Sequence, residues 1–195
     1  MSKRVMVIVA MLTVGLFASL GFAQDTTQDT SMKHDSMKHD SMKKDNASML
    51  SSSDKKFVME TAQGGMMEVE LAKLAVDKAS SEEVKQYAQR LVDDHTKAND
   101  ELTQLASQKG VMVSHDEKAM MKGKDKLSKL SGAAFDREFM NLMIKDHTKE
   151  VKEFEEASNK SKDTDVKDWA AKTLPTLREH LQMARDINTK VAMNK

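Results

Sequence analysis

The residues of this sequence best suited to chemistry are three histidines on the apolar stripes of three different helical segments. His95, His147 and His180 each stand three or four residues from apolar neighbours, and such stripes converge on the axis of a helical bundle. A fourth segment offers Glu68, and Glu150 follows His147 by one turn on the same side. Imidazole and carboxylate together suit iron, zinc or copper. These five residues are therefore the predicted core metal site.

The same pattern has a purely structural interpretation, and it excludes one kind of metal centre. A buried histidine can serve as a hydrogen-bonded core residue without any ligand. Di-iron bundles need Glu-x-x-His on two helices, but the residues three positions before the histidines are Val92, Ile144 and Leu177. The acidic neighbours Asp94, Asp146 and Glu179 point about 100° away around the helix, which prevents easy co-ligation. A ferritin-type ferroxidase centre is not expected.

A second candidate metal site lies in a pentapeptide repeat near the N-terminus. Residues 31–45 read SMKHD, SMKHD and SMKKD. Thioether and imidazole form a soft ligand set that favours Cu(I) or Ag(I). The candidate ligands are Met32, His34, Met37, His39 and Met42. The alternative is a solvated, charge-mixed spacer.

The N-terminal residues have the layout of a signal peptide. Lys3 and Arg4 precede an apolar run over 5–20, and small residues precede a cleavage point after Ala23. The run is short for a membrane span, although an uncleaved anchor is the alternative. We expect residues 1–23 to be removed, leaving no stable membrane span and an extracytoplasmic, periplasmic location. Residues 24–53 hold too little apolar surface to fold and are predicted to be disordered.

The remaining chain, 54–193, shows the periodicity of four long amphipathic helices. They are expected over 54–79, from 80 to about 110, over 133–160 and from 163 or 164 towards the C-terminus. Capping boxes are predicted at Ser80–Glu83 and at Ser114–Glu117, the latter opening a short extra helix that ends near Leu130. Gly64 and Gly65 would permit close helix approach or a kink. The predicted fold is all-α: an antiparallel, ferritin-like four-helix bundle.

Composition excludes several classes of function. The 31 basic and 31 acidic residues balance, and no aromatic platform accompanies a basic patch, so nucleic acid is not an expected partner. Cysteine is absent, which excludes disulfides and thiol catalysis. No nucleophile triad, phosphate loop or paired-carboxylate motif is present, so a role other than enzymatic catalysis is favoured.

Phe57 to Ile187 resembles the bacterial domain-of-unknown-function family 4142. The resemblance rests on these stretches: Phe57-Val58, Gly64-Gly65, the run 68–75, the runs 84–88 and 93–99, the run 135–139, Asp146-His147, Leu174-Pro175 and His180-Leu181. The family implies export and a ferritin-like helical domain, but no established activity. Its pattern centres on Glu68, His95, His147 and His180. The resemblance leaves the Met/His tail outside the family domain.

Two functions therefore remain open. The first is a metal-binding bundle of the periplasm, non-enzymatic or weakly redox-active, with a link to envelope stress. The second is a structural or interaction module that binds an envelope protein and uses its histidines only for core hydrogen bonds. The sequence leaves the metal, the partner and the oligomeric state undetermined.

Overall fold

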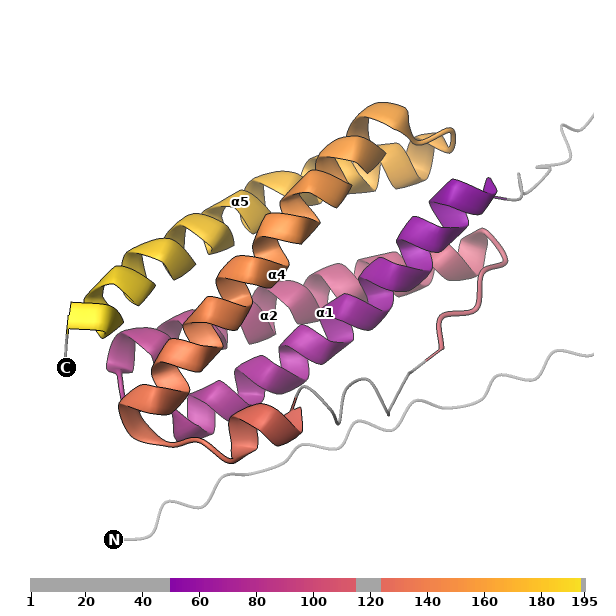
Figure 1. Ribbon diagram of the computed structural model, residues 1–195. Coiled ribbons are helices and arrows are strands. Elements are labelled where there is room, and N and C mark those ends of the chain that lie inside the picture. Colours follow the sequence, from indigo (N-terminus) through magenta and orange to yellow (C-terminus); the bar gives the residue numbers. More distant parts are fainter. Residues whose placement is uncertain (1–49, 115–123, 194–195) are drawn as a thin grey trace, which may run out of the picture. The chain divides into compact units, whose positions relative to one another are not determined.

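The computed structural model describes residues 50–114 and 124–193, whose regular secondary structure is entirely helical (Figure 1). The four long helices are α1 (Ser52–Lys78), α2 (Glu82–Gln108), α4 (Gly132–Lys160) and α5 (Thr164–Met193). A short helical stretch covers 124–128. The predicted boundaries of the four long helices agree with these to within two residues. The predicted signal peptide, residues 24–49 of the predicted tail and residues 115–123 of the predicted short helix lie outside the described residues. Residues 52 and 53, which were predicted to belong to the disordered tail, form the start of α1.

The helices pack as two hairpins. α1 packs mainly against α2 and α4 mainly against α5, while contacts of α1 with α4 and of α2 with α5 join the hairpins (Figure 1). The short links at 79–81 and 161–163 force the two helices of each hairpin to run in opposite directions. The prediction of an all-α protein is confirmed. None of the helices in the described ranges combines the length and the hydrophobicity that a membrane crossing requires.

The start of α2 is capped differently from the prediction. Ser81 is the N-cap residue, but its side chain makes no capping hydrogen bond, so the predicted Ser80–Glu83 capping box does not form. The buried carboxylate of Asp136 on α4 accepts hydrogen bonds from the backbone N–H groups of Ser80 and Ser81 and from the Ser80 hydroxyl. A carboxylate at this position satisfies free amides and interacts favourably with the helix dipole. A residue from another helix has replaced the local cap.

The opposite end of the molecule uses a second buried carboxylate in the same way. Asp54, in the first turn of α1, accepts hydrogen bonds from the backbone N–H groups of Lys162 and Asp163 in the link between α4 and α5. Buried Asp54 and Asp136 thus each tie one hairpin to the other. These contacts fix the relative positions of the helix ends.

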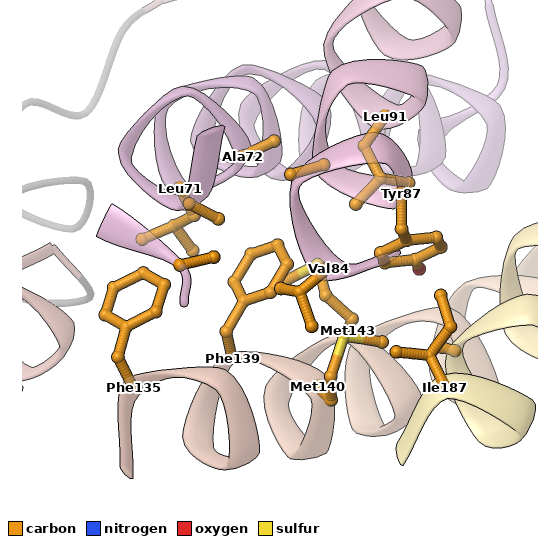
Figure 2. Close-up of a cluster of buried hydrophobic side chains, with 14 of the residues drawn as sticks. Leu71, Ala72, Val84, Tyr87, Leu91, Phe135, Phe139, Met140, Met143 and Ile187 are labelled. Atoms are coloured by element: carbon orange, nitrogen blue, oxygen red, sulfur yellow. The ribbon is translucent and has the colours of Figure 1, made fainter. Parts of the chain in front are cut away.

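A layer of buried polar side chains divides the core in two. One apolar cluster includes Leu71, Leu91 and Phe139 near the α1–α2 link (Figure 2). The other, which includes Val58 and Phe154, lies towards the link between α4 and α5. Between the clusters each long helix contributes one buried polar residue, and these are Glu68, His95, His147 and His180. The three histidines and one glutamate therefore occupy one level of the bundle.

Gly65 of α1 lies against the side chain of Asn99 on α2. A Cβ atom at Gly65 would stand 2.3 Å from Asn99 Oδ1, whereas one at Gly64 would make only an ordinary contact, 3.9 Å from Glu150 Oε1. The close approach that the glycine pair permits thus belongs to Gly65 alone. It lets α1 and α2 meet at the level of the polar layer.

The two glycines should respond differently to substitution by alanine. Gly64→Ala is expected to raise the free energy of unfolding by up to about 1 kcal/mol, because alanine favours the helix. Gly65→Ala meets Asn99 and is expected to be less stable than Gly64→Ala by roughly 1–3 kcal/mol. Urea denaturation of both variants checks this. Equal stabilities would show that Asn99 gives way without cost.

Candidate metal centre

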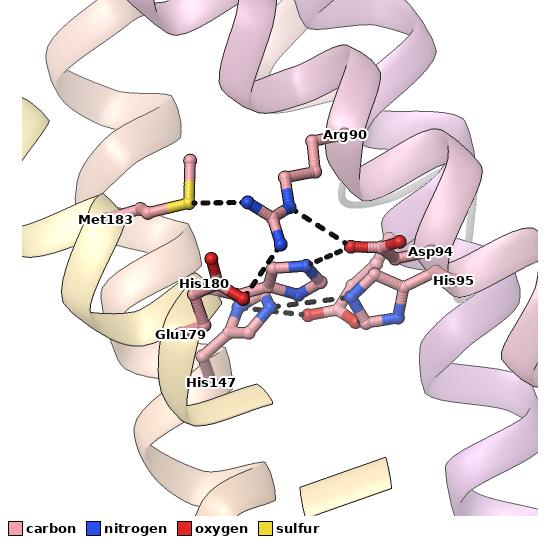
Figure 3. Close-up of polar contacts among 8 residues, drawn as sticks. Arg90, Asp94, His95, His147, Glu179, His180 and Met183 are labelled. Atoms are coloured by element: carbon pink, nitrogen blue, oxygen red, sulfur yellow. Dashed lines mark hydrogen bonds and ion pairs between the residues drawn. The ribbon is translucent and has the colours of Figure 1, made fainter. Parts of the chain in front are cut away.

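The structure brings the three predicted histidines together. His95 from α2, His147 from α4 and His180 from α5 are 6%, 0% and 1% exposed. Their ring centroids are 5.3–5.5 Å apart, and one nitrogen of each lies within 4.8 Å of the others. Figure 3 shows the rings converging from three helices. The prediction that the stripes place these imidazoles at one point is confirmed.

The outer hydrogen bonds of the rings leave an inward nitrogen free on each of two histidines. His147 Nδ1 donates to the carbonyl of Met143, 3.0 Å away, which leaves its Nε2 with a lone pair. His180 Nε2 donates to Asp94 Oδ2 over 2.8 Å, and its Nδ1 is buried without a hydrogen-bond partner among the described residues. His95 Nε2 faces His147 Nε2 across 3.4 Å. The cluster therefore presents three nitrogens towards one another.

Glu68 contacts the other side of two of these rings. Its Oε2 is 3.3 Å from His95 Nδ1 and its Oε1 is 3.6 Å from His147 Nδ1. Neither contact has hydrogen-bond geometry, so both oxygens of Glu68 are buried without a partner within the described part of the chain. Glu150 joins Glu68 and His147 in a second potential ligand group. The five predicted residues thus form two adjoining groups that share His147.

The surroundings keep the histidines neutral. Burial lowers the pKa of His95 well below its usual value, and the neighbouring histidines lower it further. Burial likewise lowers the pKa of His147 to about 4. Burial also lowers the pKa of His180, although Asp94 opposes the shift. Neutral imidazole is the form that binds metal ions, so the cluster does not have to lose protons from its rings at neutral pH.

The two glutamates favour their protonated forms. Burial, followed by the charge of Glu150, raises the pKa of Glu68 well above its usual value. Burial raises the pKa of Glu150 to about 7. No Lys or Arg forms an ion pair with either carboxyl group in the described residues. A bound cation would supply the positive charge that this pair of carboxyl groups lacks.

Asp94 is a residue of the candidate metal centre that the sequence pattern did not identify. It is adjacent to His95 on α2 and points to a different side of the helix, so the two side chains cannot easily bind the same ion. Its carboxylate instead accepts a hydrogen bond from His180 of α5. Arg90 binds Asp94 over 3.3 Å and Glu179 over 2.8 Å, which fixes the carboxylate (Figure 3). A carboxylate that holds the outer nitrogen of a histidine is the usual support of a metal ligand. Only the packing of α2 on α5 shows this pair.

The candidate tail ligands Met32, His34, Met37, His39 and Met42 all lie outside the described residues. The second predicted metal site therefore stays a prediction from the sequence.

The fold and the buried histidine layer define an all-α protein with a polar centre. Comparison with known families shows which family it belongs to. The model of the family described as domain of unknown function DUF4142 matches residues 39–187. The chain belongs to this family. The match begins inside the pentapeptide repeat, so the expectation that the whole tail lies outside the family domain is wrong for residues 39–53. Comparison with curated proteins gives no match.

Several solved structures have a similar fold. A DUF305 fragment from Deinococcus radiodurans has a TM-score of 0.63 and 17% identity, with 72% of this chain and 98% of that chain covered. CopM in its Cu(II)-bound form has a TM-score of 0.58 and 19% identity, covering 70% and 96%. CopM in its Cu(I)-bound form has a TM-score of 0.60 and 17% identity, with the same coverage. At these identities the similarity shows the fold alone.

Proposed function

We propose that this protein is an exported, metal-binding helical protein that holds one transition-metal ion between His95, His147 and His180. The proposal includes a ferritin-like four-helix arrangement, a periplasmic location and domain limits at residues 23 and 53. Three neutral imidazoles suit zinc, copper or iron. The role is binding of the ion and not a reaction on an organic substrate.

One distance carries the proposal. Two nitrogens bound at about 2.0–2.1 Å to a tetrahedral ion stand about 3.3–3.4 Å apart. His95 Nε2 and His147 Nε2 are separated by 3.4 Å. The buried Nδ1 of His180, which has no partner among the described residues, supplies the third ligand.

In this site the carboxylates position the imidazoles. Glu68 contacts the Nδ1 atoms of His95 and His147, on the side of each ring opposite the nitrogens that face each other. Asp94 holds His180 through its Nε2. Two of the three rings are thus held by a hydrogen bond to an oxygen on their outer side, His147 by the Met143 carbonyl and His180 by Asp94. This is the arrangement that orients histidine ligands.

The copper-bound forms of CopM, which shares the fold, favour copper among the candidate ions. They also support the proposal that the Met/His repeat is a second, softer site. Cu(I) prefers thioether and imidazole ligands, and the repeat offers both.

Trp169 provides a direct test of the core site. It is the only tryptophan of the chain, and it lines the same small cavity as His95 and His180. Binding of Cu(II) to the full-length protein is expected to quench its fluorescence at one equivalent. Zn(II) at 100 times its Kd should add about 2.7 kcal/mol to the free energy of unfolding.

Deletion of residues 31–45 separates the two candidate sites. The deletion should leave the quenching of Trp169 unchanged and remove the binding of Cu(I) or Ag(I) beyond the first equivalent. If zinc, copper and iron change neither the fluorescence of Trp169 nor the thermal stability of the protein, the core site is refuted. If the deletion leaves Cu(I) and Ag(I) binding unchanged, the repeat is not a ligand.

The alternative function is a structural or interaction module of the cell envelope. The hydrogen bonds of His147 to Met143 and of His180 to Asp94 favour it, because they show that these histidines also serve the fold. It predicts that substitution of the histidines by alanine lowers stability equally with and without metal ions.

A further inference from the structure

A small cavity of about 30 Å³ adjoins the histidine cluster. His95 and His180 form part of its wall, together with Glu150 of α4 and Trp169 of α5. A cavity of this volume holds about two water molecules, since roughly 10–15 Å³ is enough for one. It is too small for an organic substrate of ordinary size.

Three of the residues that line the cavity each carry a buried polar atom without a partner. Glu150 Oε2, Trp169 Nε1 and His180 Nδ1 are all buried, and none has a hydrogen-bond partner in the described ranges. Buried polar atoms are almost always satisfied, by protein or by an enclosed small molecule. Indole Nε1 can only donate, whereas a carboxyl group accepts. The wall therefore fits a small guest that accepts a hydrogen bond from the indole and makes a second hydrogen bond with the carboxyl group.

Within the described residues, neither Glu68 nor Asp94 supplies a fourth ligand to an ion between the histidines. Glu68 reaches the outer nitrogens of His95 and His147 and not the inward ones. Asp94 is engaged by His180 Nε2 and Arg90. Metal sites with three protein ligands and one open position exchange small ligands there, unlike closed structural sites.

We propose that the cavity is a site for a small exogenous ligand, either water or a small anion, at the open position of the ion. The proposal rests on the metal site proposed above. Trp169 Nε1 donates a hydrogen bond to the ligand, and the Glu150 carboxyl group accepts one from water or, when protonated, donates one to an anion. The ion is therefore accessible to small molecules, which exchange at its open position. An ion with a purely structural role would have no such position.

Azide is the probe for this site, and Co(II) is the reporter ion because its visible spectrum responds to its ligands. The full-length protein with one equivalent of Co(II) is expected to show a saturable spectral change on addition of azide. Ala98 lines the cavity and is half-buried. Ala98→Met should keep Co(II) bound and weaken azide binding at least tenfold, whereas Ala134→Met, on an exposed part of α4, should change neither.

The outcomes distinguish the two proposals. If Co(II) binds but azide leaves its spectrum unchanged, the open position is refuted while the metal site stands. If Co(II) does not bind, both fail. Thr176→Met, from the cavity wall on α5, repeats the test should Ala98→Met fail to fold. Unweakened azide binding in a folded variant would show that azide binds outside the cavity.

Discussion

Substitution of His147 by glutamine is expected to abolish tight binding of Zn(II) or Cu(II) by the core site. His147 is fully buried, faces His95 Nε2 across 3.4 Å and belongs to both potential ligand groups. Loss of a residue that merely orients a ligand lowers affinity about 10–100-fold. Loss of the ligand itself should exceed that range. Isothermal titration with each ion measures the effect, and circular dichroism confirms that the variant folds.

Asp94→Asn provides the graded comparison. Because Asp94 holds His180 from outside, this variant is expected to lose about 10–100-fold in affinity and no more. Asp93→Asn is its matched control, since Asp93 is exposed and its carboxylate accepts only from Gln89. Equal affinities of wild type, His147→Gln and Asp94→Asn would place the ion elsewhere.

The buried histidines and glutamates of the metal-free protein are expected to change its stability with pH in opposite directions. Burial lowers the pKa of His147 to about 4, so the unfolded state takes up the additional proton as the pH falls from 6.5 towards 4, and stability is lost there. Burial raises the pKa of Glu150 from 4.5 to about 7. Its contribution is complete below pH 4.5 and is lost as the pH rises through 7. Between pH 4.5 and pH 6.5 the contributions of His147 and Glu150 therefore oppose each other.

Glu150→Gln should remove the loss of stability that ionisation of Glu150 causes between about pH 4.5 and pH 7. The difference between a pKa of 4.5 and one of about 7 corresponds to on the order of 3 kcal/mol. The variant is therefore expected to gain roughly this amount over wild type between pH 5 and pH 8. Urea denaturation in the presence of a chelator measures it at both values.

Glu156→Gln is the control for this pH effect. Glu156 is exposed and pairs with Lys160 one turn further along α4. Its loss should change stability by no more than about 0.5 kcal/mol at either pH. If Glu150→Gln and wild type change in stability by the same amount from pH 5 to pH 8, the assignment of this loss to the buried Glu150 carboxyl group is contradicted.

The periodicity of the sequence was sufficient to predict the helices and the residues that face the interior. Helix formation depends on local spacing, and the apolar stripes carried His95, His147 and His180 to the interior as predicted. Gly110 follows the C-terminal end of α2, as expected. Its φ of 68° is a backbone conformation that suits glycine. The family resemblance was also visible in the sequence.

Contacts between residues on different helices could not be predicted from the periodicity of the sequence. The cap on α2 comes from Asp136, 55 residues from Ser81, and a local capping box was predicted in its place. The support of His180 comes from Asp94, 86 residues away. Spacing along one helix gives the face of a residue, but it does not give the residue's neighbour on another helix.

By itself, the sequence therefore determined four long helices, their buried faces and the three histidines at their centre. The tertiary structure decided which nitrogens face inward, which carboxylates hold the rings and where a cavity remains. The reason is that the rotation of each helix about its axis and its axial offset from its neighbours come from side-chain packing, including the contact of Gly65 with Asn99. A shift of one residue in any helix would separate the histidines.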